Sequence, residues 1–401
     1  MNNNRQQKYF FGFPINVFIL SFISFLNDIG GQTIKYAIPL FLTNSLGVKT
    51  SIIGLVEGIG DATPQLFQPL SGWITDKLKR RKRTVVFGQI FRSSILFLFF
   101  ANSWLSVLFI RFLDRSGKGV QGAPRDALIS LSAEKGTQGK AFGLSRTMDN
   151  AGAVVGLTLA GLITLFASSQ IVTLTKPVFH LIVLLAVLPT IIAVFLISLF
   201  VHDTKSVDVT VKKNIKTDSL GKKYYLFLFI TFLFTLGNSS DGFLILRTQK
   251  LGMPLPMIFF LLAAFSLVAS LLSLPMGIIS DKIGRKKSIV FGWFLYAIVY
   301  FGFAWINNLN GIIILFLLYG VYYGFFEGVA KAYVADIIPS EKKGIAFGIY
   351  NMVTGLTLFL ASLTAGTLWQ VFSPSVAFVF GGSLAIIATF FFIVTSLTSN
   401  S

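Results

Sequence analysis

The most constraining feature of this chain is a series of twelve apolar runs, each bounded by charged or turn-forming residues. A helix needs about 20 apolar residues to cross the roughly 30 Å hydrocarbon core of a bilayer. Only 12% of the residues are charged, against about 25% in soluble domains. We therefore predict an all-α membrane protein with twelve transmembrane helices. The predicted spans are 13–42, 50–75, 84–101, 104–131, 139–168, 177–200, 223–247, 254–280, 287–306, 310–337, 344–371 and 374–396.

Composition also argues against several classes of catalytic protein. The chain has no cysteine, which excludes a disulfide framework and thiolate metal sites. Its only histidines, His180 and His202, leave little basis for a histidine metal cluster or a Ser-His-Asp enzyme. The phosphate-binding pattern G-x-x-x-x-G-K-[ST] is absent, so ATP hydrolysis is not the expected energy source. We expect no enzymatic activity, no cofactor and no metal.

The distribution of lysine and arginine predicts the orientation. If the N-terminus is cytoplasmic, 22 of the 34 basic residues fall in cytoplasmic segments, and only Lys49, Lys176 and Lys250 fall on the other side. Cytoplasmic loops carry such an excess. We therefore expect a multi-pass protein of the bacterial cytoplasmic (inner) membrane with both termini inside. Because topology accounts for most of the net charge of +18, we do not expect nucleic-acid binding.

The two halves of the chain resemble each other at a constant offset of 205 residues. Gly72 and Asp76 recur as Gly277 and Asp281. This predicts an N-terminal six-helix bundle at 1–200, a cytoplasmic linker at 201–222 and a C-terminal six-helix bundle at 223–401. Two bundles in the same orientation form a parallel repeat, an arrangement of carriers that rock two bundles around a site at the membrane midplane.

The repeated loop resembles a signature of the major facilitator superfamily, roughly G-x-x-x-D-[RK]-x-G-R-[RK]. Residues 277–286 match it throughout, and residues 72–81 depart from it only at Lys79. Arg115-x-x-Lys118-Gly119 resembles the R-x-x-Q-G motif of the family's fourth span. The resemblance covers the whole chain and implies a secondary transporter that works by alternating access.

The resemblance also implies a gate at the cytoplasmic face. The glycine of each loop permits close helix packing. The aspartate can face a neighbouring helix N-terminus and pair with a nearby arginine, forming a latch that breaks when this face opens. The expected gating residues are Gly72, Asp76, Arg80, Gly277, Asp281, Arg285 and Asp126.

Nine basic and nine acidic residues lie within the predicted spans. Each costs roughly 2.5–3.5 kcal/mol at the centre of a span unless it pairs or faces water. Helical spacing predicts the pairs Asp114–Lys118, Arg146–Asp149 and Glu327–Lys331.

The resemblance implies that the first, fourth, seventh and tenth spans line the central path. On the fourth span, Arg111 and Arg115 stand one turn apart with only Asp114 as an obvious local partner. One guanidinium is then free to bind a carboxylate or phosphate, unless other acids of the first half neutralise both. The expected substrate-binding residues are Lys35, Arg111, Arg115, Asp241, Arg247, Tyr323, Glu327 and Lys331.

Three carboxylates are candidates for proton coupling. Glu57 and Asp61 are four residues apart on one face of the second span, where two adjacent carboxylates cannot easily both ionise. Asp28 lies midway along the first span, before two glycines. The alternative role for these acids is to pair with basic residues of neighbouring spans.

The sequence thus predicts a secondary active transporter, proton-coupled, that moves a small organic anion such as a carboxylate metabolite or a carboxylate siderophore. Its expected partners are that solute, protons and membrane lipid, and it is expected to be a monomer. Two alternatives stay open: a drug/proton antiporter, and a transport-inactive sensor or scaffold.

Overall fold

The computed structural model describes residues 9–78, 80–134, 137–167, 172–203, 220–339 and 342–398, with some side chains inside these ranges excepted. Among those exceptions are the side chains of Asp76 and Glu327. The helices of the first half are α1 (Ile15–Asn44), α2 (Thr50–Leu78), α3 (Arg81–Arg92) with its 3-10 continuation η1 (Ser93–Phe100), α4 (Trp104–Ser132), α5 (Gln138–Ala167) and α6 (Lys176–Phe200). A short hairpin of β1 (Tyr9–Phe10) and β2 (Phe13–Pro14) precedes them.

The helices of the second half are α7 (Lys222–Gly237), α8 (Gly242–Lys250), α9 (Leu255–Ile283), α10 (Arg285–Trp305), α11 (Leu309–Ile337), α12 (Lys343–Val371) and α13 (Pro374–Thr398). We use "first half" for the described residues up to 203 and "second half" for those from 220. The seventh predicted span is broken, because helix α7 ends at Gly237 and α8 begins at Gly242. The intervening Asn-Ser-Ser-Asp residues favour turns and caps over helix interiors.

The predicted all-α membrane fold is confirmed. Within the described ranges, ten helical segments are long and apolar enough to cross a membrane, with α3 and η1 forming one of them and α7 and α8 another. Helices α2 and α4 have comparable length but are not among the ten. Both carry charged side chains into the protein interior, among them Glu57 on α2 and Arg111 on α4.

The internal repeat is visible in the helix bounds. Helices α2 and α9 begin and end 205 residues apart, and so do α4 and α11. Most of the predicted linker, residues 204–219, lies outside the described residues, so the domain boundaries stay a prediction.

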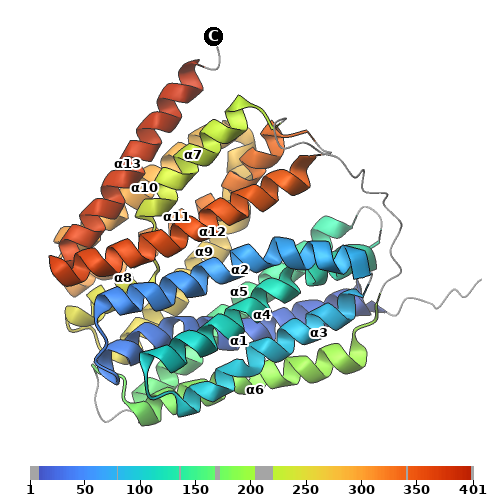
Figure 1. The fold of residues 1–401 in the computed structure, drawn as a ribbon, viewed down its shortest axis with the longest axis horizontal. Coiled ribbons are helices and arrows are strands. Elements are labelled where there is room, and N and C mark those ends of the chain that lie inside the picture. The colour runs from blue at the N-terminus through green and yellow to red at the C-terminus, as the bar shows by residue number, and fades with distance from the viewer. Residues whose placement is uncertain are drawn as a thin grey trace, which may run out of the picture.

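The halves meet along three pairs of helices: α2 with α12, α5 with α9, and α1 with α8. We call the end of the molecule that holds residues 203 and 220 the linker side. The other end, which holds the turns α1–α2 and α12–α13, is the opposite side. Figure 1 shows α2 and α12 close together at one end and diverging toward the other.

The halves are in close contact on the opposite side. Thr50 Oγ1 donates to the Gly366 carbonyl at 3.2 Å, and Ser51 Oγ to Gln370 Oε1 at 2.5 Å. A Cβ atom at Gly54 would collide with the backbone of α12, so glycine is required for this approach.

The linker side is splayed. A Cβ atom at Gly143 on α5 or Gly348 on α12 would have no neighbour within 4 Å. The carboxylates of Asp281 and Asp336 are more than half exposed. The structure is therefore closed on the opposite side and open on the linker side.

Candidate solute cavity between the halves

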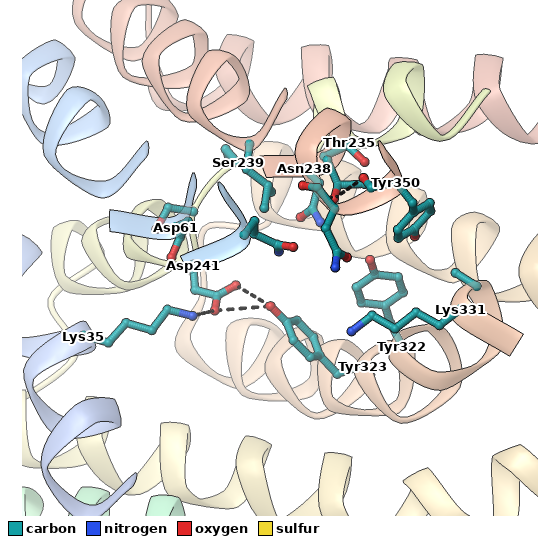
Figure 2. A pocket seen from close by; sticks show the side chains of 16 residues that line it. Lys35, Asp61, Thr235, Asn238, Ser239, Asp241, Tyr322, Tyr323, Lys331 and Tyr350 are labelled. Carbon is teal, nitrogen blue, oxygen red and sulfur yellow. Dashed lines mark hydrogen bonds and ion pairs between the residues drawn. The ribbon is translucent and has the colours of Figure 1, made fainter. Parts of the chain in front are cut away.

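Two adjoining chambers lie between the halves. The first-half chamber, of about 480 Å³, is lined mainly by α1, α2, α4 and α5. The second-half chamber, of about 260 Å³, is lined mainly by α7, α11, α12 and the α7–α8 break. The two chambers share the lining residues Lys35, Asp61, Gln65, Tyr323 and Lys331. They therefore adjoin at these residues, and the second-half chamber is drawn in Figure 2.

The first-half chamber has an excess of positive charge. Four carboxylates line it: Asp28, Asp61, Asp126 and Asp149. Seven cationic side chains line it as well: Lys35, Arg92, Arg115, Lys118, Arg125, Arg146 and Lys331. Clustered cations in a partly desolvated cavity attract anions more strongly than they would in bulk water.

Asp114 is shared by two of these cations. One carboxylate oxygen lies 3.7 Å from Arg92 Nε and the other 3.5 Å from Arg115 Nε. The expected Asp114–Lys118 pair is not formed, because Asp114 serves the two arginines while Lys118 lines the chamber. Arg115 Nε and Nη2 are buried without a hydrogen-bond partner among the described residues. Arg115 lines the chamber, but these two nitrogen atoms are buried and Nε faces Asp114, so a solute reaches them only when the side chain moves.

Arg111 has a different environment one turn away. Its Nη2 donates to Glu57 Oε2 at 2.9 Å, and both side chains are almost fully buried. Neither residue lines the two chambers. Ser240 Oγ, in the α7–α8 break, donates to the same Glu57 oxygen at 2.8 Å. This interaction therefore connects α4 and α2 of the first half to the second half. Glu57 thus pairs with a basic residue of a neighbouring span, which is the alternative to a role in proton coupling.

The chambers meet at a second contact between the halves, centred on Asp241. Lys35 Nζ on α1 lies 2.8 Å from Asp241 Oδ2. The hydroxyl groups of Tyr36 and Tyr319 donate to the same carboxylate at 3.3 and 2.9 Å. Tyr323 contributes a weaker bond of 3.3 Å, as Figure 2 shows. Burial of the Asp241 charge is thus compensated by one ammonium group and three phenols.

Two of the predicted proton-coupling carboxylates lie open to the cavity. Asp28 lines the first-half chamber and Asp61 lines both. Both are half-buried, and neither has a hydrogen bond or ion pair to another part of the described chain. Asp149, expected to pair with Arg146, instead has Arg125 Nη1 at 3.9 Å. Arg125 also donates to Ser24 Oγ at 2.7 Å.

The second-half chamber is polar but mostly uncharged. Only Ala330 and Leu358 contribute purely aliphatic side chains to its lining, and three tyrosines add aromatic rings. Ten of the sixteen lining residues are neutral and polar: Gln65, Thr235, Asn238, Ser239, Ser240, Tyr322, Tyr323, Tyr350, Asn351 and Thr354. The amide groups of Gln65, Asn238 and Asn351 have no hydrogen-bond partner within the described ranges. They are available to a solute.

The remaining predicted binding residues differ in position. Lys331 is exposed at the junction of the chambers. Arg247 lines neither chamber, contrary to the expectation that it faces the path. It donates to the Phe303 carbonyl at 3.2 Å and to Asn307 Oδ1 at 2.7 Å, because the unsatisfied carbonyls at the end of α10 lie within its reach. The Glu327 side chain, with the predicted Glu327–Lys331 pair, lies outside the described part.

The predicted gating residues are clearest in the second half. Arg285 pairs with Asp281 one turn before it, and its Nε lies 3.5 Å from Asp336 of α11. At Gly277 a Cβ atom would have no neighbour within 4 Å, so this glycine does not serve close packing here.

The gating residues of the first half are only partly described. A Cβ atom at Gly72 would lie 3.3 Å from that of Ala123, consistent with close packing. Arg80 is exposed, and the Asp76 side chain lies outside the described residues. Asp126 pairs with Arg125 at 3.2 Å and lines the first-half chamber.

Sequence reasoning missed most of the neutral lining. Asn351 and Gln65 were not singled out, since an isolated amide in an apolar run carries no periodic signal, and Asn238 belongs to the Asn-Ser-Ser-Asp segment without being predicted as a binding residue. Arg92 and Lys118 are two of the nine basic residues within the predicted spans, and neither is among the predicted substrate-binding residues. The only sequence signal for a place on the solute path was that each lies within a predicted span, where a charge must pair or face water.

Comparison with known proteins places these features in a family context. The model of the Major Facilitator Superfamily matches residues 20–240 and 226–400. An uncharacterised transporter of this type from Methanocaldococcus jannaschii is 37% identical over 388 residues, which cover 93% of each chain. The quinolone resistance protein NorA of Staphylococcus aureus is 28% identical over 170 residues, 42% of this chain and 44% of NorA.

Solved structures share the fold at low identity. A variant of the nucleoside transporter NupG superposes with a TM-score of 0.78 at 14% identity, covering 94% of this chain and 99% of that one. A POT family transporter in complex with 5-aminolevulinic acid gives a TM-score of 0.80 at 12% identity, with 98% of both chains covered. At these identities the likeness concerns the fold alone.

Proposed function

This chain belongs to the major facilitator superfamily, and on that premise we propose that it is a proton-coupled carrier of small, hydrophilic organic anions. It works as a monomer in the cytoplasmic membrane with its linker side in the cytoplasm. The observation that carries the anion assignment is the first-half chamber, where seven cations face four lining carboxylates and three of the cations pair with two further acids, Asp114 and Asp241.

Arg115 is the proposed anion ligand. Its guanidinium lines the first-half chamber, and Nε and Nη2 have no hydrogen-bond partner among the described residues, so a change of side-chain rotamer would present a fork to a carboxylate. Arg111 lies one turn away on α4 but is paired with Glu57 away from both chambers. The two arginines thus form a matched test pair on one helix.

The test is anion binding to the purified protein and to Arg115→Lys and Arg111→Lys variants, measured by isothermal titration calorimetry. Lysine keeps the charge but loses the fork. Arg115→Lys should weaken anion binding at least about tenfold, equivalent to 1.4 kcal/mol. Arg111→Lys should leave it within about twofold, although it can lower stability by disturbing the Glu57 pair.

The cavity lining argues against the drug-efflux alternative. NorA is named for quinolone resistance and matches 42% of this chain, which is the observation in favour of efflux. A broad drug site needs mostly apolar walls, whereas fourteen of the sixteen lining residues of the second-half chamber carry a polar or charged group. If binding is seen only for apolar cations, and Arg115→Lys leaves it unchanged, the anion proposal is wrong and efflux replaces it.

Alternating access requires the closed opposite side to open. Several contacts between the halves would then break, among them Lys35–Asp241, Glu57–Ser240 and Ser51–Gln370. Since the native chain contains no cysteine, a Ser51→Cys/Gln370→Cys variant can be cross-linked with a short bis-maleimide. Cross-linking should abolish transport in proteoliposomes, while each single variant treated alike transports normally. Full transport by the cross-linked protein would exclude rocking about this contact.

Asp28 and Asp61 are the proposed proton-coupling groups, because both carboxylates line the cavity without a fixed partner. A cavity carboxylate can change partner when it gains a proton. Asp28→Asn and Asp61→Asn should remove accumulation driven by a proton gradient. Exchange of labelled for unlabelled solute should persist, because it needs no net proton movement. Undiminished accumulation by both variants would refute this assignment.

A further inference from the structure

The two chambers differ so strongly in charge that they can hold chemically different ends of one solute. We infer that the second-half chamber is a subsite for the neutral, hydroxyl-bearing end of an organic anion whose carboxylate lies in the first-half chamber. This inference rests on the proposed function and names the substrate class within it.

The second-half chamber has unused hydrogen-bonding groups in its lining. Asn238 in the α7–α8 break and Asn351 on α12 line the second-half chamber, and each amide offers two donors and one acceptor. Neither amide is used by another residue in the part of the chain that the structure describes. Thr354, one turn after Asn351, donates its hydroxyl to the Tyr350 carbonyl at 2.9 Å and can still accept a bond.

The charged side chains of the second-half chamber balance one another. The chamber contains two cations, Lys35 and Lys331, and two carboxylates, Asp61 and Asp241. Lys35 and Asp241 neutralise each other at 2.8 Å. The chamber therefore has no excess of either charge, unlike its neighbour, and does not favour a second ionic group on the solute.

The apolar surface of the second-half chamber is interspersed with polar groups. Ala330 and Leu358 are the only lining residues with purely aliphatic side chains, and the remaining apolar surface belongs to residues that also carry a polar group, such as Tyr322, Tyr323 and Tyr350. An alkyl group placed there would remove water from the amides and hydroxyls without replacing their hydrogen bonds, which carries a free-energy cost. A solute that carries hydroxyl groups restores those bonds. The chamber thus discriminates between two acids of the same length.

The two chambers adjoin, so one solute can extend from one into the other. Gln65, Tyr323 and Lys331 line both chambers, so an anionic group in one and a neutral chain in the other would meet at these side chains. The combined space accommodates a solute of about a dozen non-hydrogen atoms and its water. An inorganic anion would fill only the first-half chamber.

The experiment compares two six-carbon monocarboxylates: gluconate, with five hydroxyl groups, and hexanoate, with none. Affinities are measured by isothermal titration calorimetry on the full-length protein. Gluconate should bind at least about tenfold more tightly than hexanoate, because several unsatisfied hydrogen bonds separate them. Inorganic phosphate serves as the probe for the first-half chamber alone.

Variants locate the discrimination. Asn351→Ala and Thr354→Val should each weaken gluconate binding roughly two- to twelvefold, the range expected for one lost hydrogen bond. Hexanoate and phosphate affinities should stay within twofold. Thr367→Val is the matched control: it lies on the same helix, its hydroxyl donates to the Leu363 carbonyl at 2.8 Å, and it is exposed outside both chambers.

The outcomes separate the two proposals. Equal affinities for gluconate and hexanoate, both weakened by Arg115→Lys, would overturn the subsite and leave the anion carrier standing. Loss of phosphate binding in Asn351→Ala would also overturn it, because the effect would then be structural. Failure of gluconate to bind overturns the inference, and if phosphate and hexanoate also fail while tetraphenylphosphonium binds, the proposed function fails with it.

Discussion

Helices α4 and α11 occupy equivalent places in the two halves, yet their inward-facing residues belong to different chemical classes. At the 205-residue offset, Asp114 corresponds to Tyr319 and Lys118 to Tyr323. Charged groups on α4 line the first-half chamber, whereas phenols on α11 donate to Asp241. The fold thus fixes where a cavity helix lies, and the side chains decide what that helix can bind.

Helices α4 and α11 also differ in how closely their backbones are packed. Arg115 corresponds to Gly320, where a Cβ atom would lie 3.0 Å from the Phe265 carbonyl oxygen of α9. Helix α11 therefore packs tightly on α9 at the level where α4 carries a guanidinium. Charge on α4 and close packing on α11 are alternative solutions at one position of the repeat.

The largest effect should come from removing the shared carboxylate of α4. Asp114→Ala leaves Arg92 and Arg115 buried without their acid, and breaking a buried ion pair costs about 3–5 kcal/mol. We expect a marked fall in the thermal unfolding midpoint in detergent, followed by tryptophan fluorescence. Asp203→Ala, at an exposed aspartate, is the control. A change as small as that of the control would mean that water already solvates the two arginines.

The equivalent change on α11 should be milder. Tyr319→Phe removes one hydrogen bond of 2.9 Å to a carboxylate that keeps Lys35 as its partner. Hydrogen bonds to charged groups contribute about 1.5–3 kcal/mol. The same unfolding measurement applies, with Tyr333→Phe on the same helix as control. A loss as large as that of Asp114→Ala would contradict the proposed difference between the helices.

Anion affinity should distinguish the next pair of positions. Lys118→Gln removes one chamber cation and should weaken anion binding by about 1 kcal/mol, roughly fivefold, with a smaller effect at high salt. Tyr323→Phe, at the equivalent position of α11, should leave phosphate affinity within twofold. Calorimetry at two ionic strengths tests both. If the tyrosine variant shows the larger loss of phosphate affinity, the assignment of the anion to the first half is wrong.

The smallest effect on stability is expected at the linker-side latch. Asp281 is more than half exposed and Arg285 keeps Asp336 as a second partner, so Asp281→Asn should change unfolding by only about 0.5 kcal/mol. The same free energy shifts a balanced two-state gate about twofold, so the transport rate should change more visibly than the unfolding midpoint. An unchanged rate together with an unchanged midpoint would remove Asp281 from the gate.

The sequence alone determined the membrane fold, because apolar runs of bilayer length, their basic flanks and a 205-residue repeat are local or periodic features. It also identified the charged residues that must face the interior. It did not assign their partners. Asp114 was matched with Lys118 by helical spacing, but Arg92 of α3 reaches the same carboxylate.

Only the tertiary structure decided which charges line the cavity and which are neutralised. Arg111 and Arg115 are indistinguishable by spacing, yet Arg111 pairs with Glu57 of α2 outside both chambers, whereas Arg115 lines the first-half chamber beside Asp114. The Lys35–Asp241 contact joins residues 206 positions apart. Helical periodicity reports the face of one helix, whereas pairing in a low-dielectric interior depends on which faces of different helices meet.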